Sequence, residues 1–128
     1  MIQNTFAVVA ATFLLAGCGK PDVRRAFAQC ESEAYQKIGL QPEQKAPNQY
    51  LEAKKELVRV CLVQQGYKAK GGFDRTSHSL KVREEIHNSY GTFTTPRSDI
   101  EPQTRKAIED EIERQMLLFD LRAENWSS

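Results

Sequence analysis

The stretch VRRAFAQCESEAYQKI, residues 23–38, predicts the first helix of this chain. Its apolar residues recur at steps of three and four positions, which is the spacing of one face of an α-helix. These positions are Val23, Ala26, Phe27, Cys30, Ala34 and Ile38. Gly39 follows as a helix terminator. We therefore expect an amphipathic helix that carries Cys30 on its buried face.

A second helix is expected after a loop, residues 40–47, that contains two prolines. Asn48 is a suitable N-cap, and Gly66 is a suitable end. The residues predicted to face inward are Leu51, Leu57, Val58, Cys61 and Leu62. Two helices joined by a short loop fold back on each other. We therefore expect a helical hairpin over residues 22–66, with Cys30 opposite Cys61.

The rest of the chain also favours helices. Residues 67–76 are polar and glycine-rich and predict a basic linker, 77–90 predict a short helix, and 92–96 predict a second linker. Residues 99–125 predict a long amphipathic helix with a wide apolar stripe. That stripe contains Ile108, Ile112, Met116, Leu117, Leu118, Phe119, Leu121, Ala123 and Trp126. The sequence therefore predicts an all-α fold.

The N-terminus carries an uncharged apolar run, residues 6–16. Its eleven residues are too few to span a bilayer, which takes roughly 20. The length fits the apolar core of a secretory signal peptide, and small residues follow where a peptidase would cut. The alternative is a buried helix, although the run has no polar face.

The run ends in Leu15-Ala16-Gly17-Cys18, a leucine and two small residues before a cysteine. This motif resembles the lipobox of bacterial lipoproteins. The resemblance implies a signal peptide over 1–17, cleavage before Cys18, and acyl chains such as palmitate on that cysteine. Gly19 and Lys20 replace the aspartate that retains such proteins in the inner membrane, so the resemblance favours the outer membrane. The mature chain, 18–128, has the size of one small domain.

This resemblance places the chain in an oxidising compartment, where disulfides persist. With Cys18 lipidated, Cys30 and Cys61 remain and are expected to pair. Two buried thiols are the alternative. The residues from Cys61 to Tyr67 also resemble the Cys-(Leu or Met)-x-x-x-Gly-Tyr helix ending of many small exported bacterial proteins, which implies the same hairpin and no activity.

Charge gives a weaker indication of a partner. The chain has 18 basic and 17 acidic residues, so we expect no nucleic-acid partner. Residues 68–83 carry a local excess of positive charge that could contact anionic lipid or an acidic protein. The candidate partner-binding residues are Lys68, Lys70, Arg75, Lys81 and Arg83. A solvated loop is the alternative interpretation.

No pattern in the chain indicates catalysis. His78 and His87 are nine positions apart, and Glu84 with His87 could share a helix face, but a metal site needs a further ligand. The chain has no Gly-rich phosphate loop and no Gly-x-Ser-x-Gly motif. We therefore expect neither catalytic residues nor a metal or other cofactor.

Two functions from different classes fit these expectations. The first is a lipid-anchored component of the cell envelope that faces the periplasm, has no catalytic activity and docks on another envelope protein. The second is an inhibitor or immunity-type protein that binds a toxin or hydrolase at the membrane. An assembly component is expected to co-purify with membrane proteins, whereas an inhibitor is expected to abolish the activity of one soluble enzyme.

Overall fold

The computed structural model describes residues 22–70 and 73–128. The predicted signal peptide and the predicted lipidation site, Cys18, lie outside the described residues. The prediction of an all-α fold is confirmed. The elements are α2 (Val23–Ile38), α3 (Asn48–Gln64), β1 (Lys68–Ala69), α4 (Phe73–Ser89), the 3₁₀ turn η1 (Arg97–Asp99), α5 (Pro102–Asp120), the 3₁₀ turn η2 (Ala123–Asn125) and β2 (Trp126–Ser127).

The helical hairpin forms from α2 and α3. Helix α2 begins where Asp22 Oδ1 accepts a hydrogen bond from the backbone N–H of Arg24, which satisfies one of the free donors at the helix start. It ends at Gly39, whose φ of 82° lies in the left-handed region that favours glycine. The disulfide between Cys30 and Cys61 joins the two helices, with a Cα–Cα distance of 5.6 Å.

The start of α3 differs from the expectation. Pro47 takes the N-cap position and makes no capping bond through its side chain, because proline offers no acceptor atom there. Asn48 is already helical, and its amide Nδ2 donates to the backbone oxygen of Asp110 at 2.9 Å. Asn48 thus ties the hairpin to α5 and does not cap α3.

The loop between α2 and α3 is also attached to α5. The Arg114 guanidinium donates hydrogen bonds to the backbone oxygens of Ala46 and Glu43. Tyr50, near the start of α3, donates its hydroxyl hydrogen to the backbone oxygen of Gly39. These bonds satisfy carbonyl groups that a loop would otherwise expose to water, so the loop has a defined path.

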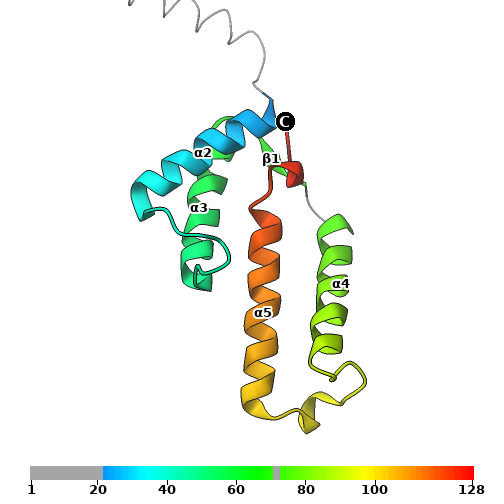
Figure 1. The fold of residues 1–128 in the computed structure, drawn as a ribbon. Helices are drawn as coiled ribbons and strands as arrows, with labels where there is room; N and C mark the ends of the chain where they lie inside the picture. Colours follow the sequence, from blue (N-terminus) through cyan, green and yellow to red (C-terminus); the bar gives the residue numbers. More distant parts are fainter. Residues whose placement is uncertain (1–21, 71–72) are drawn as a thin grey trace, which may run out of the picture.

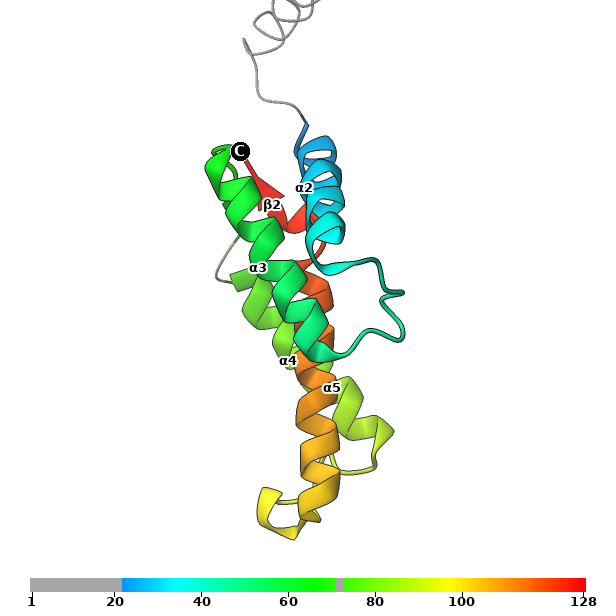
Figure 2. The same cartoon turned by 90° about the vertical axis from the view of Figure 1, so that its left-hand side faces the viewer.

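Helix α5 is the long axis of the molecule and lies between α3 and α4 (Figure 1). Figure 2 shows α2 and the C-terminus at one end and the turn between α4 and α5 at the other. A helix of 19 residues is about 28 Å long. The two ends of the molecule are therefore well separated.

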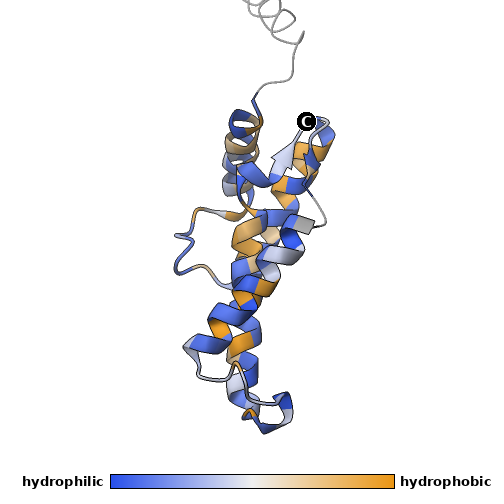
Figure 3. Ribbon diagram, turned by 90° about the vertical axis from the view of Figure 1, so that its right-hand side faces the viewer, coloured by the Kyte–Doolittle hydropathy of each residue, from blue (hydrophilic) through white to orange (hydrophobic). Residues whose placement is uncertain are grey.

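Two buried apolar clusters line α5. Figure 3 shows hydrophobic residues recurring along the helices, as an amphipathic pattern requires. The larger group, here called the disulfide cluster, has these buried members: Ala26, Phe27, Cys30, Ala34, Ala46, Tyr50, Leu51, Val58, Leu62, Tyr67, Leu117, Leu121 and Trp126. The smaller group, here called the tip cluster, consists of Val82, Ile86, Ile100, Ile108 and Ile112. Each cluster occupies a different part of α5.

The second half of the chain differs from the expected boundaries. Helix α4 starts at Phe73, four residues before the expected short helix, so the expected basic linker holds β1 and the first turn of α4. Helix α5 starts at Pro102, since proline is well tolerated in a first helical turn. It ends at Asp120 and does not reach residue 125.

A two-stranded antiparallel ribbon closes the end of the molecule near α2. It pairs Lys68 with Ser127 and Ala69 with Trp126. Lys70 extends it by donating its backbone N–H to the oxygen of Asn125 at 2.8 Å. The Asn125 amide in turn donates to the backbone oxygen of Phe119 at 2.6 Å. The chain thus leaves α5 in a defined turn and carries Trp126 into the disulfide cluster.

One charged residue is buried inside the hairpin. Lys54 is 1% exposed, and its Nζ lies 2.8 Å from Glu31 Oε2 and 2.7 Å from Tyr35 Oη. Burial alone would lower the pKa of Lys54, but the hydrogen bonds to Glu31 and Tyr35 outweigh this effect, and the pKa is raised from its usual value. The ammonium group therefore stabilises the packing of α2 on α3 in its charged form.

The raised pKa of Lys54 predicts a pH dependence of stability. A group with a higher pKa in the folded state contributes its full stabilisation below its unfolded pKa of about 10.4, and loses it as pH rises through the folded value. Between roughly pH 9 and pH 11.5, urea denaturation should show a larger loss of unfolding free energy for the wild type than for Lys54→Met. Other titrating groups are common to both proteins, so parallel curves would contradict the prediction.

Candidate functional site

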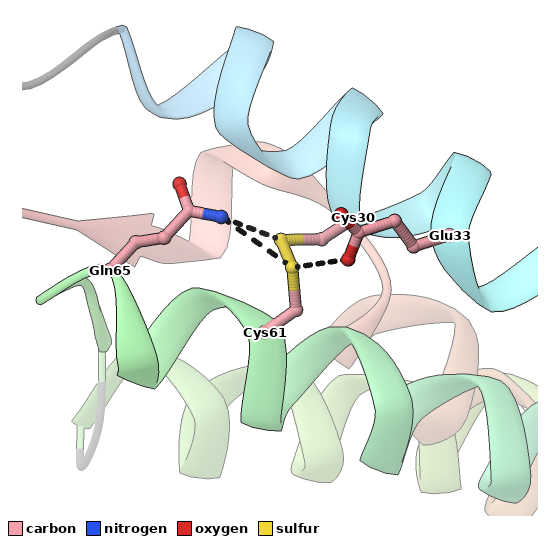
Figure 4. Close-up of a disulfide and its surroundings, with 4 residues drawn as sticks. All are labelled: Cys30, Glu33, Cys61 and Gln65. Carbon is pink, nitrogen blue, oxygen red and sulfur yellow. Dashed lines mark hydrogen bonds between the residues drawn. A yellow bond between two sulfur atoms is a disulfide. The ribbon is translucent and has the colours of Figure 1, made fainter.

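The disulfide serves the fold and leaves little reactive surface. Figure 4 shows Gln65, just after the end of α3, reaching toward both sulfur atoms, with its Nε2 3.4 Å from Cys30 Sγ and 3.5 Å from Cys61 Sγ. Glu33 Oε2 from α2 lies 3.4 Å from Cys61 Sγ. Cys30 itself is fully buried. We therefore assign the pair a stabilising role.

The basic residues singled out in the sequence do not form one patch. Lys68 and Lys70 lie at the ribbon, whereas Lys81 and Arg83 lie on α4. Arg75 is paired with Asp120, which it contacts through Nε at 3.1 Å, and this hydrogen bond raises the pKa of the guanidinium further above its usual value. Although these residues are close in the sequence, the fold places them on different elements.

Two of these basic residues line a shallow hollow beside the ribbon. Lys70 and Arg75 share it with Lys55, Arg59, Ala69, Asp120, Asn125 and Trp126. Its volume is about 240 Å³, which is below the range of roughly 300–1,000 Å³ that is usual for ligand pockets. Lys55 also contacts Asp120, at 3.4 Å. The local charge is therefore partly neutralised within the fold.

A larger pocket lies at the other end of the molecule, where α4 turns into α5. Its volume is about 540 Å³, within the usual range for a ligand site. We call it the tip pocket. It is lined by Leu80, Arg83, Glu84 and His87 of α4, by Thr92, Phe93, Thr95 and Arg97 of the connection, and by Ile100, Arg105, Ile108 and Glu109 at the start of α5.

The connection that lines the tip pocket has a defined conformation. Gly91, with φ of 69°, lets the chain leave α4 in a left-handed conformation. Thr92 then donates its backbone N–H to the oxygen of His87 at 2.8 Å. The Thr92 hydroxyl lies 2.9 Å from His87 Nδ1. These bonds fix the orientation of the imidazole at the edge of the pocket.

The tip pocket combines three guanidinium groups with two carboxylates. Arg83 and Glu109 form an ion pair at 3.6 Å. Arg97 and Arg105 have no carboxylate at ion-pairing distance within ranges 22–70 and 73–128. Arg105 Nε is buried and has no hydrogen-bond partner in this part of the chain. An unpaired buried donor is unfavourable. The unpaired guanidinium groups of Arg97 and Arg105 leave the pocket with an excess of positive charge, which suits an anionic ligand.

Apolar side chains stand beside these charges. Leu80 is 65% exposed and Phe93 is 56% exposed, and both line the tip pocket. Tyr90, 45% exposed, lines a neighbouring hollow between α4 and α5. Large apolar groups left in water at one end of a molecule favour a contact surface there.

The sequence-predicted histidines take different positions. His87 and Glu84 both line the tip pocket, as their spacing on one helix suggested. His78 instead stacks on Phe119 of α5, with 4.3 Å between ring centroids. Among the described residues, no three histidine, cysteine, aspartate or glutamate side chains come together as metal ligands would.

Arg97 and Arg105 were missed by the sequence analysis. They lie outside the basic segment 68–83 and in the half of the chain with an acidic balance. Their position beside α4 in one pocket depends on the turn between the two helices, which no local pattern encodes. One signal was available in the sequence. Pro102 predicts a helix start, and Arg97 and Arg105 lie on either side of it, so both could be expected near the beginning of α5.

None of the helices in the described ranges is long and apolar enough to cross a bilayer. No protein-family model matches the chain, and no curated protein or solved structure is detectably similar to it.

Proposed function

We propose that this chain is a lipid-anchored cell-envelope protein that acts as a non-catalytic interaction component. The lipobox-like motif supports an anchor at Cys18, four residues before Asp22, where the described chain begins. Attachment at that point leaves the helical body in the periplasm. Gly19 and Lys20 favour the outer membrane over the inner.

The separation of the two ends of the molecule carries this proposal. The described chain begins at the end formed by α2 and the ribbon, and the tip pocket lies at the opposite end of α5 (Figures 1 and 2). An anchor before α2 would hold the first end close to the lipid surface. The tip pocket, with its exposed Leu80 and Phe93, would then face away from the membrane, where a second protein can reach it.

An inhibitor or immunity-type role is the second candidate. Phe93 is exposed in the turn between α4 and α5, and an aromatic side chain on a protruding turn is suited to filling the cleft of an enzyme. The two roles differ in their partner. An inhibitor binds one soluble enzyme and abolishes its activity, whereas an assembly component stays bound to membrane proteins after extraction.

The anchor predicts a defined mass for protein extracted from bacterial membranes. We expect a chain of residues 18–128 that carries acyl groups and is about two hydrogens lighter than the dithiol form. Intact mass spectrometry under non-reducing conditions measures both features at once. The Cys18→Ser variant should lose the acyl mass and leave the membrane fraction. A wild-type mass that starts at Met1 would contradict the proposal.

A further inference from the structure

We propose that the tip pocket binds the C-terminal carboxylate of a partner protein whose last residue has a large apolar side chain. This inference rests on the proposed function, since it names the chemical class of the partner left open there. Its basis is the combination of unpaired guanidinium groups and exposed apolar side chains within one pocket of about 540 Å³.

The charges of the pocket favour an anion. Of the five permanently charged or acidic groups that line it, Arg83 and Glu109 pair with each other at 3.6 Å. This leaves Arg97 and Arg105 against Glu84 alone. A carboxylate bound between the two arginines would neutralise the excess positive charge, because guanidinium and carboxylate groups form strong charge-assisted hydrogen bonds.

Arg105 gives a second, independent reason. Its Nε is buried and finds no acceptor among the described residues, although buried donors are nearly always hydrogen-bonded. Because this atom is closed off from solvent in the structure, a ligand oxygen would supply the missing acceptor only when the Arg105 side chain turns further into the pocket that it lines. Arg105 belongs to α5 and Arg97 to η1, so the fold places the backbone of both residues beside the pocket before a ligand arrives.

The apolar wall selects the rest of the ligand. Leu80, Phe93, Ile100 and Ile108 line the same pocket as the arginines. Ile100 and Ile108 are buried, whereas Leu80 and Phe93 remain exposed. A ligand side chain that covers Leu80 and Phe93 would remove apolar surface from water, which contributes roughly 25 cal/mol per Å². The ligand therefore needs an apolar group close to its carboxylate.

A chain end meets these requirements better than an internal acidic residue. The pocket is walled by α4, by the connection over 92–97 and by the start of α5. A C-terminal residue carries its carboxylate and its side chain on the same Cα, so the two groups can reach adjacent parts of the pocket.

The test compares two synthetic pentapeptides, acetyl-Gly-Gly-Ser-Gly-Phe, one with a free C-terminal carboxylate and the other with an amide. Binding to the full lipidated chain in detergent is followed by NMR chemical shifts. The acid should bind at least about ten-fold more tightly than the amide, since a hydrogen bond to a charged group contributes about 1.5–3 kcal/mol. Equal binding of the two peptides, or no binding of either, would overturn the proposal.

Three variants locate the interaction. Arg97→Gln and Arg105→Gln should each reduce the affinity for the acid toward that for the amide. Lys106→Gln is the matched control, because it removes one positive charge from α5 at a position that pairs with Asp110 and is absent from the pocket lining. Arg97 is exposed, so its variant keeps the fold even if Arg105→Gln does not. An equal loss in Lys106→Gln would overturn the assignment to this pocket.

Cross-linking in the host envelope separates this inference from the proposed function. If an envelope partner cross-links equally to the wild type and to the Arg97→Gln/Arg105→Gln variant, the pocket proposal is overturned and the proposed function stands. If the wild type cross-links to no envelope protein, the proposed function is overturned. The peptide comparison still decides the pocket proposal in that case.

Discussion

Reduction of the Cys30–Cys61 disulfide is expected to lower the free energy of unfolding by roughly 3–4 kcal/mol. The bond spans 31 positions. It restricts the unfolded chain to conformations in which Cys30 and Cys61 stay together. Small domains have a total stability of only about 5–15 kcal/mol. The midpoint of thermal unfolding, followed by circular dichroism, should therefore be lower by about 15 °C in the presence of dithiothreitol than in its absence.

A cysteine-free hairpin provides the control for this measurement. The Cys30→Ala/Cys61→Ala variant should melt near the midpoint of the reduced wild type and show no response to the reductant. Because Cys30 is fully buried, intact mass must first confirm that reduction is complete. An unchanged midpoint in fully reduced wild type would show that the bond contributes little and that packing alone holds α2 on α3.

Replacement of Trp126 by alanine is expected to have an effect of similar size, about 3–5 kcal/mol. Trp126 is 5% exposed and belongs to the disulfide cluster, although it lies two residues from the end of the chain. Its indole Nε1 also donates to the backbone oxygen of Asp120 at 3.4 Å. Urea denaturation of the variant measures the loss, which arises mainly from the cavity that the truncated side chain leaves.

Trp126→Phe separates the contribution of packing from that of the hydrogen bond. Phenylalanine fills much of the same volume and lacks the indole donor, so we expect a clearly smaller loss than for alanine. Phe93→Ala serves as a control for the loss of an aromatic ring, because Phe93 is exposed and its removal should change stability little. A Trp126→Ala variant as stable as the wild type would contradict the observed packing.

The helical hairpin could be predicted because its signals are local and agree with each other. The three- and four-residue spacing between Val23 and Ile38 is repeated in the burial of Ala26, Phe27, Cys30 and Ala34. Glycine ended both helices as expected, at Gly39 with φ of 82° and at Gly66 with φ of 89°. The disulfide was expected from the resemblance to exported lipoproteins, and the position of both cysteines on facing sides of the hairpin supported that expectation.

The end of the chain could not be predicted in the same way. Trp126 continues the spacing of the apolar stripe of α5, so the pattern alone extends the helix past Asp120. In the structure the chain turns through η2, and Ala69 pairs with Trp126 in the ribbon. A strand of two residues is too short to show the alternation of apolar and polar residues that predicts a strand. The two strands are also far apart in the sequence, so no local pattern predicts their pairing.

The tip pocket was only partly predictable. Glu84 and His87 were singled out because they share a face of one helix, and both do line the pocket. Arg97 and Arg105 come from the next elements along the chain, so their approach to α4 is a tertiary feature. The ion pairs of the expected basic residues were not predictable for the same reason, since Arg75 and Arg83 each pair with an acidic residue of α5.

The division of the buried residues into two clusters along α5 bears on how the molecule opens. The tip cluster contains five buried residues and no covalent link, whereas the disulfide cluster is larger and cross-linked. Local opening of a protein begins where fewest apolar contacts hold it closed. Helix α4 can therefore detach from α5 at a lower free energy than the hairpin can unfold, so the amide hydrogens of α4 and of the first two turns of α5 should exchange before those of the hairpin.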